Sequence, residues 1–190
     1  MGVVQQRRWT RVEYDRIVAA GVFSPGERLE LIDGEVVAMT PQGSAHATAV
    51  RLVEDALRAA FGAGYDVRVQ MPLALDPASE PEPDVAVVQG RPRDYRDAHP
   101  ASAVLAVEVG DTTLVYDREQ KASLYARGGV AEYWILNLVG RTLEVYREPA
   151  ALPDARYGWG YRVTSTYGPD DHIAPLAAPR ARLRIADLLP

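Results

Sequence analysis

The stretch Pro83-Asp84-Val85-Ala86-Val87-Val88, followed by Ala103-Val104-Leu105-Ala106-Val107-Glu108-Val109, decides the fold. Both segments contain short continuous apolar runs, which are typical of strands covered on both faces. Each segment carries one carboxylate, Asp84 at the start of the first apolar run and Glu108 near the end of the second. If the two runs form neighbouring strands, both carboxylates converge at one site.

The chemistry of these two carboxylates is the next question. Burying a lone carboxylate is costly, so an ionised Glu108 needs a cation, a metal ion or several hydrogen-bond donors. In an alternating strand, Glu108 shares its face with the small residues Ala106 and Gly110, which leaves space beside it. Carboxylate, carbonyl and water oxygens are the ligands that Mg²⁺ prefers. Alternatively, Asp84 caps a turn and Glu108 pairs with an arginine, since structural ion pairs also perturb carboxylates.

Lys121 is the only lysine among the 21 lysine and arginine residues. An ammonium group is compact and strongly hydrated, which suits it to contact a phosphate or a nucleophilic water. The spacing predicts a helix over 114–127 that packs back on the Glu108 strand, with one stripe made of Leu114, Asp117, Lys121, Leu124 and Tyr125. Lys121 can therefore reach the carboxylates. Alternatively, Lys121 is incidental on a wet helix face, where it forms only a weak surface pair with Asp117.

Composition limits the classes of protein. The 190 residues, 47% hydrophobic and 25% charged, fit one globular domain over 1–190. We expect a cytoplasmic protein, because no apolar run is long enough to span a membrane and no signal peptide is evident. The absence of cysteine excludes disulfides, thiolate catalysis and Cys-based zinc sites. A net charge of −5 argues against a basic nucleic-acid coat, so DNA binding would use a local, salt-sensitive arginine patch.

The pattern along the chain predicts a mixed α/β fold. A capping box starts a helix over 10–20, and Asp33-Gly34 joins two strand-like runs as a hairpin. A second helix is predicted over 45–61, and Gly128-Gly129 ends the helix over 114–127. We predict the remaining strands at 65–70, 73–75, 84–88, 103–109, 132–138, 142–147, 160–166 and 180–185.

Several short motifs recur together in one known family. The matching stretches are Leu29-Glu30-Leu31-Ile32-Asp33-Gly34-Glu35, His46, Pro83-Asp84-Val85-Ala86-Val87-Val88, Val107-Glu108-Val109, Tyr116-Asp117…Lys121…Leu124-Tyr125 and Gly129-Val130-Ala131-Glu132-Tyr133-Trp134-Ile135. Over roughly 10–147 the chain resembles the Uma-two family of restriction endonucleases, a branch of the PD-(D/E)XK nuclease fold. Two departures stand out: Gly110 occupies the usual lysine position, and Gly110-Asp111-Thr112-Thr113 replaces a Ser-Pro-Ser-Thr-like loop.

The resemblance implies a restriction-endonuclease-like α/β fold. Its core, at about 45–138 within a single nuclease-like domain over 1–190, is a mixed central sheet flanked by helices in the order αβββαβ, beginning with the helix at Ala45. An N-terminal helix and β-hairpin precede this core, and a β-rich extension follows it.

The resemblance also implies hydrolysis of DNA phosphodiester bonds with Mg²⁺ or Mn²⁺. Asp84, Glu108 and the Val109 carbonyl would hold the metal, and Lys121 would position or activate the attacking water. Glu30, His46 and Asp117 match family positions and are supporting candidates, Asp117 as a residue that orients Lys121.

Two other readings remain open. The acidic net charge and Gly110 also suit a catalytically silent binding or assembly module that kept the fold. Hydrolysis of RNA or nucleotides at the same site is a third possibility. A homodimer is expected by analogy with enzymes that cut both strands of a duplex.

Overall fold

The central element is a six-stranded sheet in the order β3-β4-β5-β6-β7-β8. The computed structural model describes residues 6–24, 26–39 and 41–190. The strands of this sheet are β3 (Tyr65–Val69), β4 (Val85–Gln89), β5 (Leu105–Gly110), β6 (Glu132–Asn137), β7 (Thr142–Ala151) and β8 (Trp159–Tyr167). Only the β5–β6 pair is parallel, so the sheet is mixed, as predicted.

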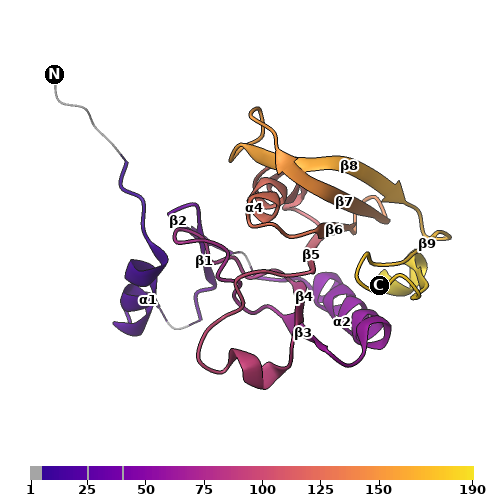
Figure 1. Cartoon of the computed structure of the whole chain (residues 1–190), viewed down its shortest axis with the longest axis horizontal. Helices are drawn as coiled ribbons and strands as arrows, with labels where there is room; N and C mark the ends of the chain where they lie inside the picture. The colour runs from indigo at the N-terminus through magenta and orange to yellow at the C-terminus, as the bar shows by residue number, and fades with distance from the viewer. Residues whose placement is uncertain (1–5, 25, 40) are drawn as a thin grey trace.

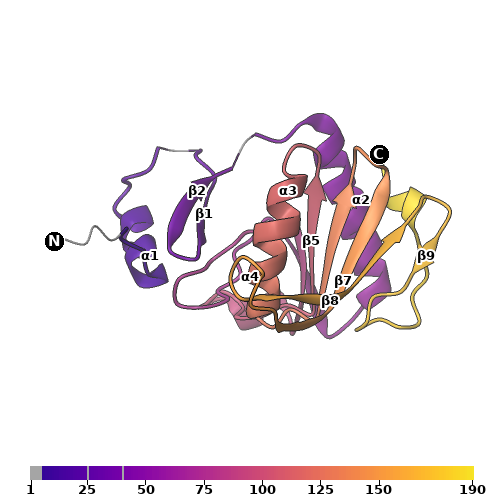
Figure 2. The ribbon, with the colours of Figure 1, turned by 90° about the horizontal axis from the view of Figure 1, so that it is seen from above.

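Helices cover both faces of the sheet. On one side lies α2 (Ser44–Phe61), and on the other lie α3 (Leu114–Tyr116), the π-helical turn η2 (Asp117–Lys121) and α4 (Ala122–Arg127) (Figures 1 and 2). The segment from α3 to α4 is the crossover that a parallel strand pair requires. The order from α2 to β6 is therefore αβββαβ, and the predicted fold class is confirmed.

The apolar runs of β4 and β5 explain this layered arrangement. Val85 and Val107 belong to the core cluster beneath α2, whereas Ala86 and Ala106 belong to the cluster on the α4 side. Alternate side chains of each strand thus enter two different cores. This double coverage is why the strands are continuously apolar.

The N-terminal part adds a helix and a hairpin outside the sheet. The helix α1 (Arg11–Ala19) begins with the predicted capping box between Thr10 and Glu13. The hairpin consists of β1 (Leu29–Ile32) and β2 (Glu35–Ala38). Its turn residues Asp33 and Gly34 have φ angles of 48° and 80°, as a two-residue turn of the predicted Asp-Gly type needs.

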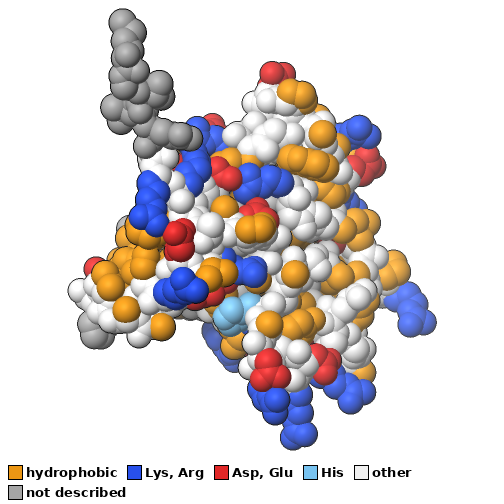
Figure 3. Space-filling model, turned by 60° about the vertical axis from the view of Figure 1, so that its left-hand side comes forward, with side chains coloured by type: hydrophobic (Ala, Val, Ile, Leu, Met, Phe, Trp, Pro, Cys, Tyr) orange, Lys and Arg blue, Asp and Glu red, His pale blue; other side chains and the backbone are white. Residues whose placement is uncertain are grey.

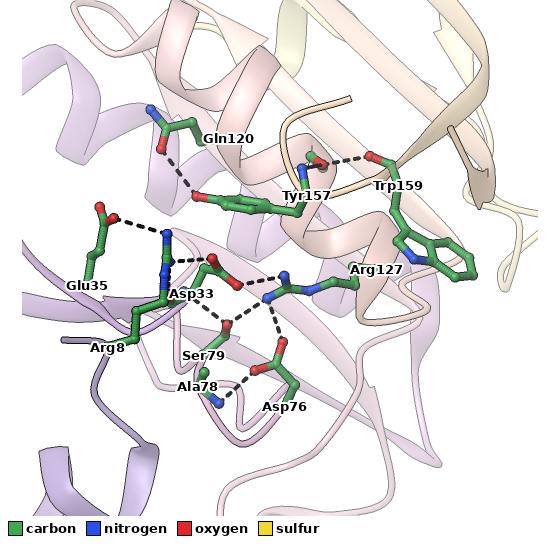
Figure 4. Close-up of polar contacts among 11 residues, drawn as sticks. Arg8, Asp33, Glu35, Asp76, Ala78, Ser79, Gln120, Arg127, Tyr157 and Trp159 are labelled. Carbon is green, nitrogen blue, oxygen red and sulfur yellow. Dashed lines mark hydrogen bonds and ion pairs between the residues drawn. The ribbon is translucent and has the colours of Figure 1, made fainter. Parts of the chain in front are cut away.

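An arginine fixes this hairpin to the rest of the molecule. Arg127, the last residue of α4, donates to Asp33 Oδ1 at 2.7 Å and to Asp76 Oδ2 at 2.9 Å (Figure 4). Its guanidinium also lies over the ring of Tyr157, 5.0 Å from the centroid. The Ser79 hydroxyl accepts from Arg127 and from the Asp33 backbone N–H. The hairpin turn, the 76–80 loop and α4 therefore form one connected network.

The C-terminal part packs on the α2 side of the sheet. It contains β9 (His172–Ile173), β10 (Leu183–Arg184) and the 3₁₀ helix η3 (Ile185–Leu188); another 3₁₀ helix, η1 (Pro92–Tyr95), follows β4. Ile173 and Leu188 join the α2 core cluster. Among the described residues, no helix is long and apolar enough to cross a membrane.

Two strand predictions are wrong. Residues 73–75 form no strand, because Leu73 N–H donates to Pro81 and Ala74 N–H donates to Pro100, two separate segments. Their apolar character reflects the complete burial of Leu73. The predicted strand 180–185 shrinks to the two residues of β10, since the chain turns into η3 at Ile185.

Candidate active site

The register of β4 and β5 brings the two carboxylates together. These strands are antiparallel, with Val85 opposite Val107, so Asp84 lies beside Glu108. The Val109 N–H donates to Asp84 Oδ2 at 2.9 Å, and the Asp84 N–H lies 3.3 Å from Glu108 Oε2. Asp84 and Glu108 are each only 6% exposed. The predicted convergence is therefore present in the fold.

Lys121 lies directly against this pair. Its Nζ is 3.2 Å from Glu108 Oε1 and 2.5 Å from Glu30 Oε2, and the side chain is only 1% exposed. Glu30 comes from β1 of the hairpin, far from the other two residues in sequence. The lysine thus connects the hairpin to the sheet through two buried carboxylates.

A π-helical turn determines where Lys121 points. In η2 the Ala122 N–H donates to the Asp117 carbonyl five residues earlier. The extra residue in this turn shifts Lys121 relative to Asp117, and such turns are frequent at functional sites. The alternative surface pair of Asp117 and Lys121 is wrong: no ion pair joins them, and both side chains are buried.

The surroundings of Gly110 leave little room for a side chain at this position. A Cβ atom at this position would lie 2.5 Å from Leu114 Cδ2 and 3.2 Å from Asp117 Oδ2. A lysine at 110 would therefore collide with the start of the helical segment. Lys121 approaches the same carboxylate, Glu108, from the helix on that side of the sheet.

Polar side chains surround Asp84 and Glu108. Asp84 Oδ1 lies 3.1 Å from His46 Nε2 and accepts from Gln42 and Gln70 at 3.2 and 3.3 Å. The hydroxyl of Tyr125 donates to Glu108 Oε1 at 2.7 Å. Each carboxylate is therefore held in a defined orientation.

Burial and charge shift the pKa values in this cluster. Burial raises the pKa of Glu108 to about 8, although the positive charge of Lys121 opposes the shift. Burial alone would lower the pKa of Lys121, but the charges of Glu108 and Glu30 outweigh it and raise that pKa. Lys121 therefore stays protonated in the cluster.

His46 and Asp117 lie at the edge of the cluster. Burial acts to lower the pKa of His46, but the hydrogen bond and charge of Asp84 outweigh it and raise that pKa. Asp117 accepts from Thr113 Oγ1 at 2.7 Å, and burial raises the pKa of Asp117 to about 6. Asp117 does not contact Lys121 directly, so any orienting effect would act at a distance.

A pocket of about 300 Å³ opens beside these groups. Its wall includes Asp84 and Glu108 together with the supporting candidates Glu30, His46 and Asp117. Three further charged residues line it: Arg28, Glu82 and Asp111. Lys121 lies behind the wall. One buried oxygen, Glu30 Oε1, has no hydrogen-bond partner among the residues that the structure describes.

The oxygen donors of this pocket fit a hard divalent cation. Asp84, Glu108 and Val109 line the pocket together, and the first two are carboxylates on adjacent strands. Within the described ranges, no group of three or more His, Cys, Asp or Glu side chains could hold a metal ion. The fit therefore relies on two carboxylates, a main-chain carbonyl and water. Mg²⁺ commonly keeps several waters and binds through one or two carboxylates.

Sequence reasoning missed four parts of this arrangement. It did not predict the contact of Glu30 with Lys121, the hydroxyl of Tyr125, the amides of Gln42 and Gln70, or Arg28 in the wall. Only the hairpin residues left a usable signal, because 28 and 30 share a face in an extended chain.

Comparison with solved structures shows that another protein shares this architecture. A protein from Anabaena variabilis ATCC 29413, described as "a putative nuclease belonging to DUF820", has a similar structure with a TM-score of 0.62. The two chains are 18% identical, and the match covers 85% of this chain and 89% of the other. This likeness concerns the fold.

The family itself follows from the sequence match. The family model Uma2, described as "Putative restriction endonuclease", matches residues 11–179. The chain therefore belongs to the Uma2 family, which confirms the resemblance. The search of curated proteins gave no match.

Proposed function

We propose that this protein is a metal-dependent endonuclease that hydrolyses DNA phosphodiester bonds. One observation carries the proposal: Asp84 and Glu108 meet on adjacent strands at a pocket, with the only lysine buried against Glu108. Membership of the Uma2 family and the nuclease-like fold support the same class of reaction.

Each residue has a distinct role in this proposal. Asp84, Glu108 and the carbonyl of Val109 would hold Mg²⁺ or Mn²⁺. The bound ion would polarise the scissile phosphate and lower the pKa of a bound water. His46 and the two glutamine amides hold Asp84 in place through Oδ1.

Lys121 contributes a fixed positive charge. Its ammonium has three donors, of which Glu30 and Glu108 accept two. The third donor can orient the attacking water or stabilise the negative charge that develops on the phosphate. Glu30 keeps Lys121 protonated, which favours positioning and charge stabilisation over proton abstraction.

DNA would bind through local contacts. Acidic and basic side chains are interspersed on the face shown in Figure 3, and the net charge is −5. Binding should therefore be salt-sensitive and modest. A homodimer and a cytoplasmic location accompany this proposal as further predictions.

A catalytically silent binding module is the second candidate. It is favoured by the small set of metal-binding side chains in the described residues and by the raised pKa of Glu108, which opposes its ionisation. Such a module would bind without metal-dependent cleavage.

The deciding experiment is cleavage of plasmid DNA, duplex oligonucleotides and RNA in Mg²⁺, Mn²⁺ or EDTA. The wild type is compared with Glu108→Gln and Asp84→Asn, and with Glu144→Gln as a matched control outside the pocket. Metal-dependent cutting of DNA that only the pocket variants lose supports the nuclease. Cutting that survives in Glu108→Gln, or that is absent from the wild type, contradicts it; preferential cutting of RNA changes the substrate class.

A further inference from the structure

The hairpin β1–β2 supplies a basic side chain as well as an acidic one. Arg28 immediately precedes β1, and its carbonyl accepts the N–H of Met39 at 2.8 Å, which extends the pairing of the hairpin. Arg28, Glu30 and Met39 all line the pocket. Since alternate residues of an extended chain share a face, Arg28 and Glu30 both face the pocket. The hairpin is therefore one of its walls.

This wall is held in place from outside the pocket. Arg127 binds the Asp33 carboxylate at the hairpin turn, as Figure 4 shows. On the same strand, Leu31 and Glu80 exchange backbone hydrogen bonds with N···O distances of 3.4 and 2.7 Å. Glu30, next to Leu31 in the strand, contacts Lys121. Arg28 is thus carried by an element fixed to both the loop at 76–80 and α4.

The guanidinium of Arg28 differs from three others that bind carboxylates. Arg118, Arg127 and Arg147 each form ion pairs shorter than 3 Å. Within the described part of the chain, Arg28 has no carboxylate partner within 4 Å and donates no side-chain hydrogen bond. It is half-buried and lies in the pocket wall. Its five donors remain available.

The charge of Arg28 acts across the pocket. It opposes protonation of both His46, on α2, and Glu82, in the segment that precedes Asp84. Glu82 and Arg28 both line the pocket but form no ion pair within 4 Å. The pocket therefore combines a carboxylate pair suited to a cation with the guanidinium of Arg28, which no described residue pairs with and which is suited to an anion.

We propose that Arg28 is a phosphate-binding residue that positions the DNA backbone in this pocket. Guanidinium groups bind phosphate oxygens bidentately, and such contacts fix register without reading sequence. The hairpin would then deliver Glu30 to Lys121 and Arg28 to the substrate. This inference rests on the proposed function for its substrate, but it concerns binding and can be tested without cleavage.

The test is equilibrium binding of a fluorescent duplex oligonucleotide, measured by anisotropy at several salt concentrations. Arg28→Met and Arg28→Lys are made in the Glu108→Gln background, so that cleavage does not interfere. The matched control is Arg93→Met, which removes one exposed arginine. Arg93 lies in η1, which follows the C-terminal end of β4, whereas Asp84 precedes the N-terminal end of that strand. Thermal melting of each variant checks folding.

Loss of Arg28 should weaken binding about 10- to 100-fold, the range for a hydrogen-bonded charged group. The slope of log K against log salt should fall by about 0.9, because one phosphate contact is lost. Arg28→Lys should keep the slope and recover part of the affinity. Two duplexes of unrelated sequence should respond equally.

Three results would overturn the inference. They are an unchanged salt slope in Arg28→Met, an equal loss in Arg93→Met, or no detectable binding of the duplex by the starting protein. Binding that depends on Arg28 without any cleavage by the wild type would support the inference while contradicting the nuclease. Cleavage by the wild type, together with DNA binding that does not depend on Arg28, would support the nuclease and contradict the inference.

Discussion

The protein has two groups of buried carboxylates that pair with different cations. The arginine-paired group consists of Glu132 and Glu144, and the lysine-paired group consists of Glu30 and Glu108. Glu132 on β6 and Glu144 on β7 are 0% and 6% exposed, as deeply buried as Asp84 and Glu108. Their partners are arginines, whereas Glu108 and Glu30 share one lysine. The comparison contrasts carboxylates paired with arginine with those to which we assign a chemical role in the proposed function.

The arginine-paired group is saturated. Glu132 Oε1 accepts from the indole of Trp134 and from two nitrogens of Arg147, and its Oε2 accepts from the Leu176 N–H. Glu144 accepts from two nitrogens of Arg118 and from Asn137 and Tyr146. No carboxylate oxygen in this group is left without a donor, so the group has little capacity to bind anything else.

The lysine-paired group is not saturated. Glu30 Oε1 has no partner in the described residues, and a pocket borders Glu30, Asp84 and Glu108. Burial of the same residue type thus has different consequences according to the donors supplied. An unsatisfied oxygen is costly in a core but useful at a site for a cation or a substrate.

The largest expected effect concerns the choice of lysine at 121. Lys121→Met should reduce kcat for DNA cleavage by about 10²- to 10³-fold, as removal of a preorganised charge does in other sites. Lys121→Arg should not restore it, because the larger planar guanidinium does not fit a fully buried ammonium site. Single-turnover cleavage by folded variants is the measurement. Wild-type rates in Lys121→Arg would remove the distinction between the two groups.

The next effect concerns the stability of the fold and lies in the arginine-paired group. Glu132→Gln should lower the free energy of unfolding by about 3 kcal/mol, because it breaks a buried ion pair with Arg147. For a chain of this size, that corresponds to a fall in Tm of roughly 6–12 °C. Chemical denaturation of Glu132→Gln beside Asp84→Asn measures the contrast. An equal loss in Asp84→Asn would show that the pocket carboxylate is structural as well.

The sequence predicted that the two carboxylates converge because Glu108 lies in a short, strongly patterned strand and Asp84 immediately precedes another. Val85 and Val107 fix the register, and register alone brings Asp84 to Glu108. The π-helical turn and the contact between Glu30 and Lys121 could not be predicted in this way. The contact joins segments about 90 residues apart, and the turn depends on a local change of helical hydrogen bonding; hydrophobic periodicity encodes neither.

A smaller effect distinguishes the two groups by pH. The folded pKa of Glu108 is about 8, above its ordinary value of 4.5, so Glu108 binds its proton more tightly in the folded state. Its contribution to stability is therefore complete below pH 4.5 and is lost as pH rises through 8. Between pH 5 and 8.5, the wild type should lose more stability than Glu108→Gln in urea denaturation without metal. Parallel pH profiles for the two proteins would contradict this expectation.

The smallest effect is a change of stability with pH in the opposite direction, in the arginine-paired group. Hydrogen bonds from Arg118 lower the pKa of Glu144, so the pair stabilises the fold above the ordinary pKa of 4.5 and loses this contribution as pH falls. Arg118 is 41% exposed, so solvent screening limits the contribution to about 1 kcal/mol or less. The difference in unfolding free energy between wild type and Glu144→Gln should therefore shrink from pH 7 to pH 3.5. A difference that grows toward acid pH would mean that Glu144 is held protonated, and the arginine-paired group would then resemble the pocket.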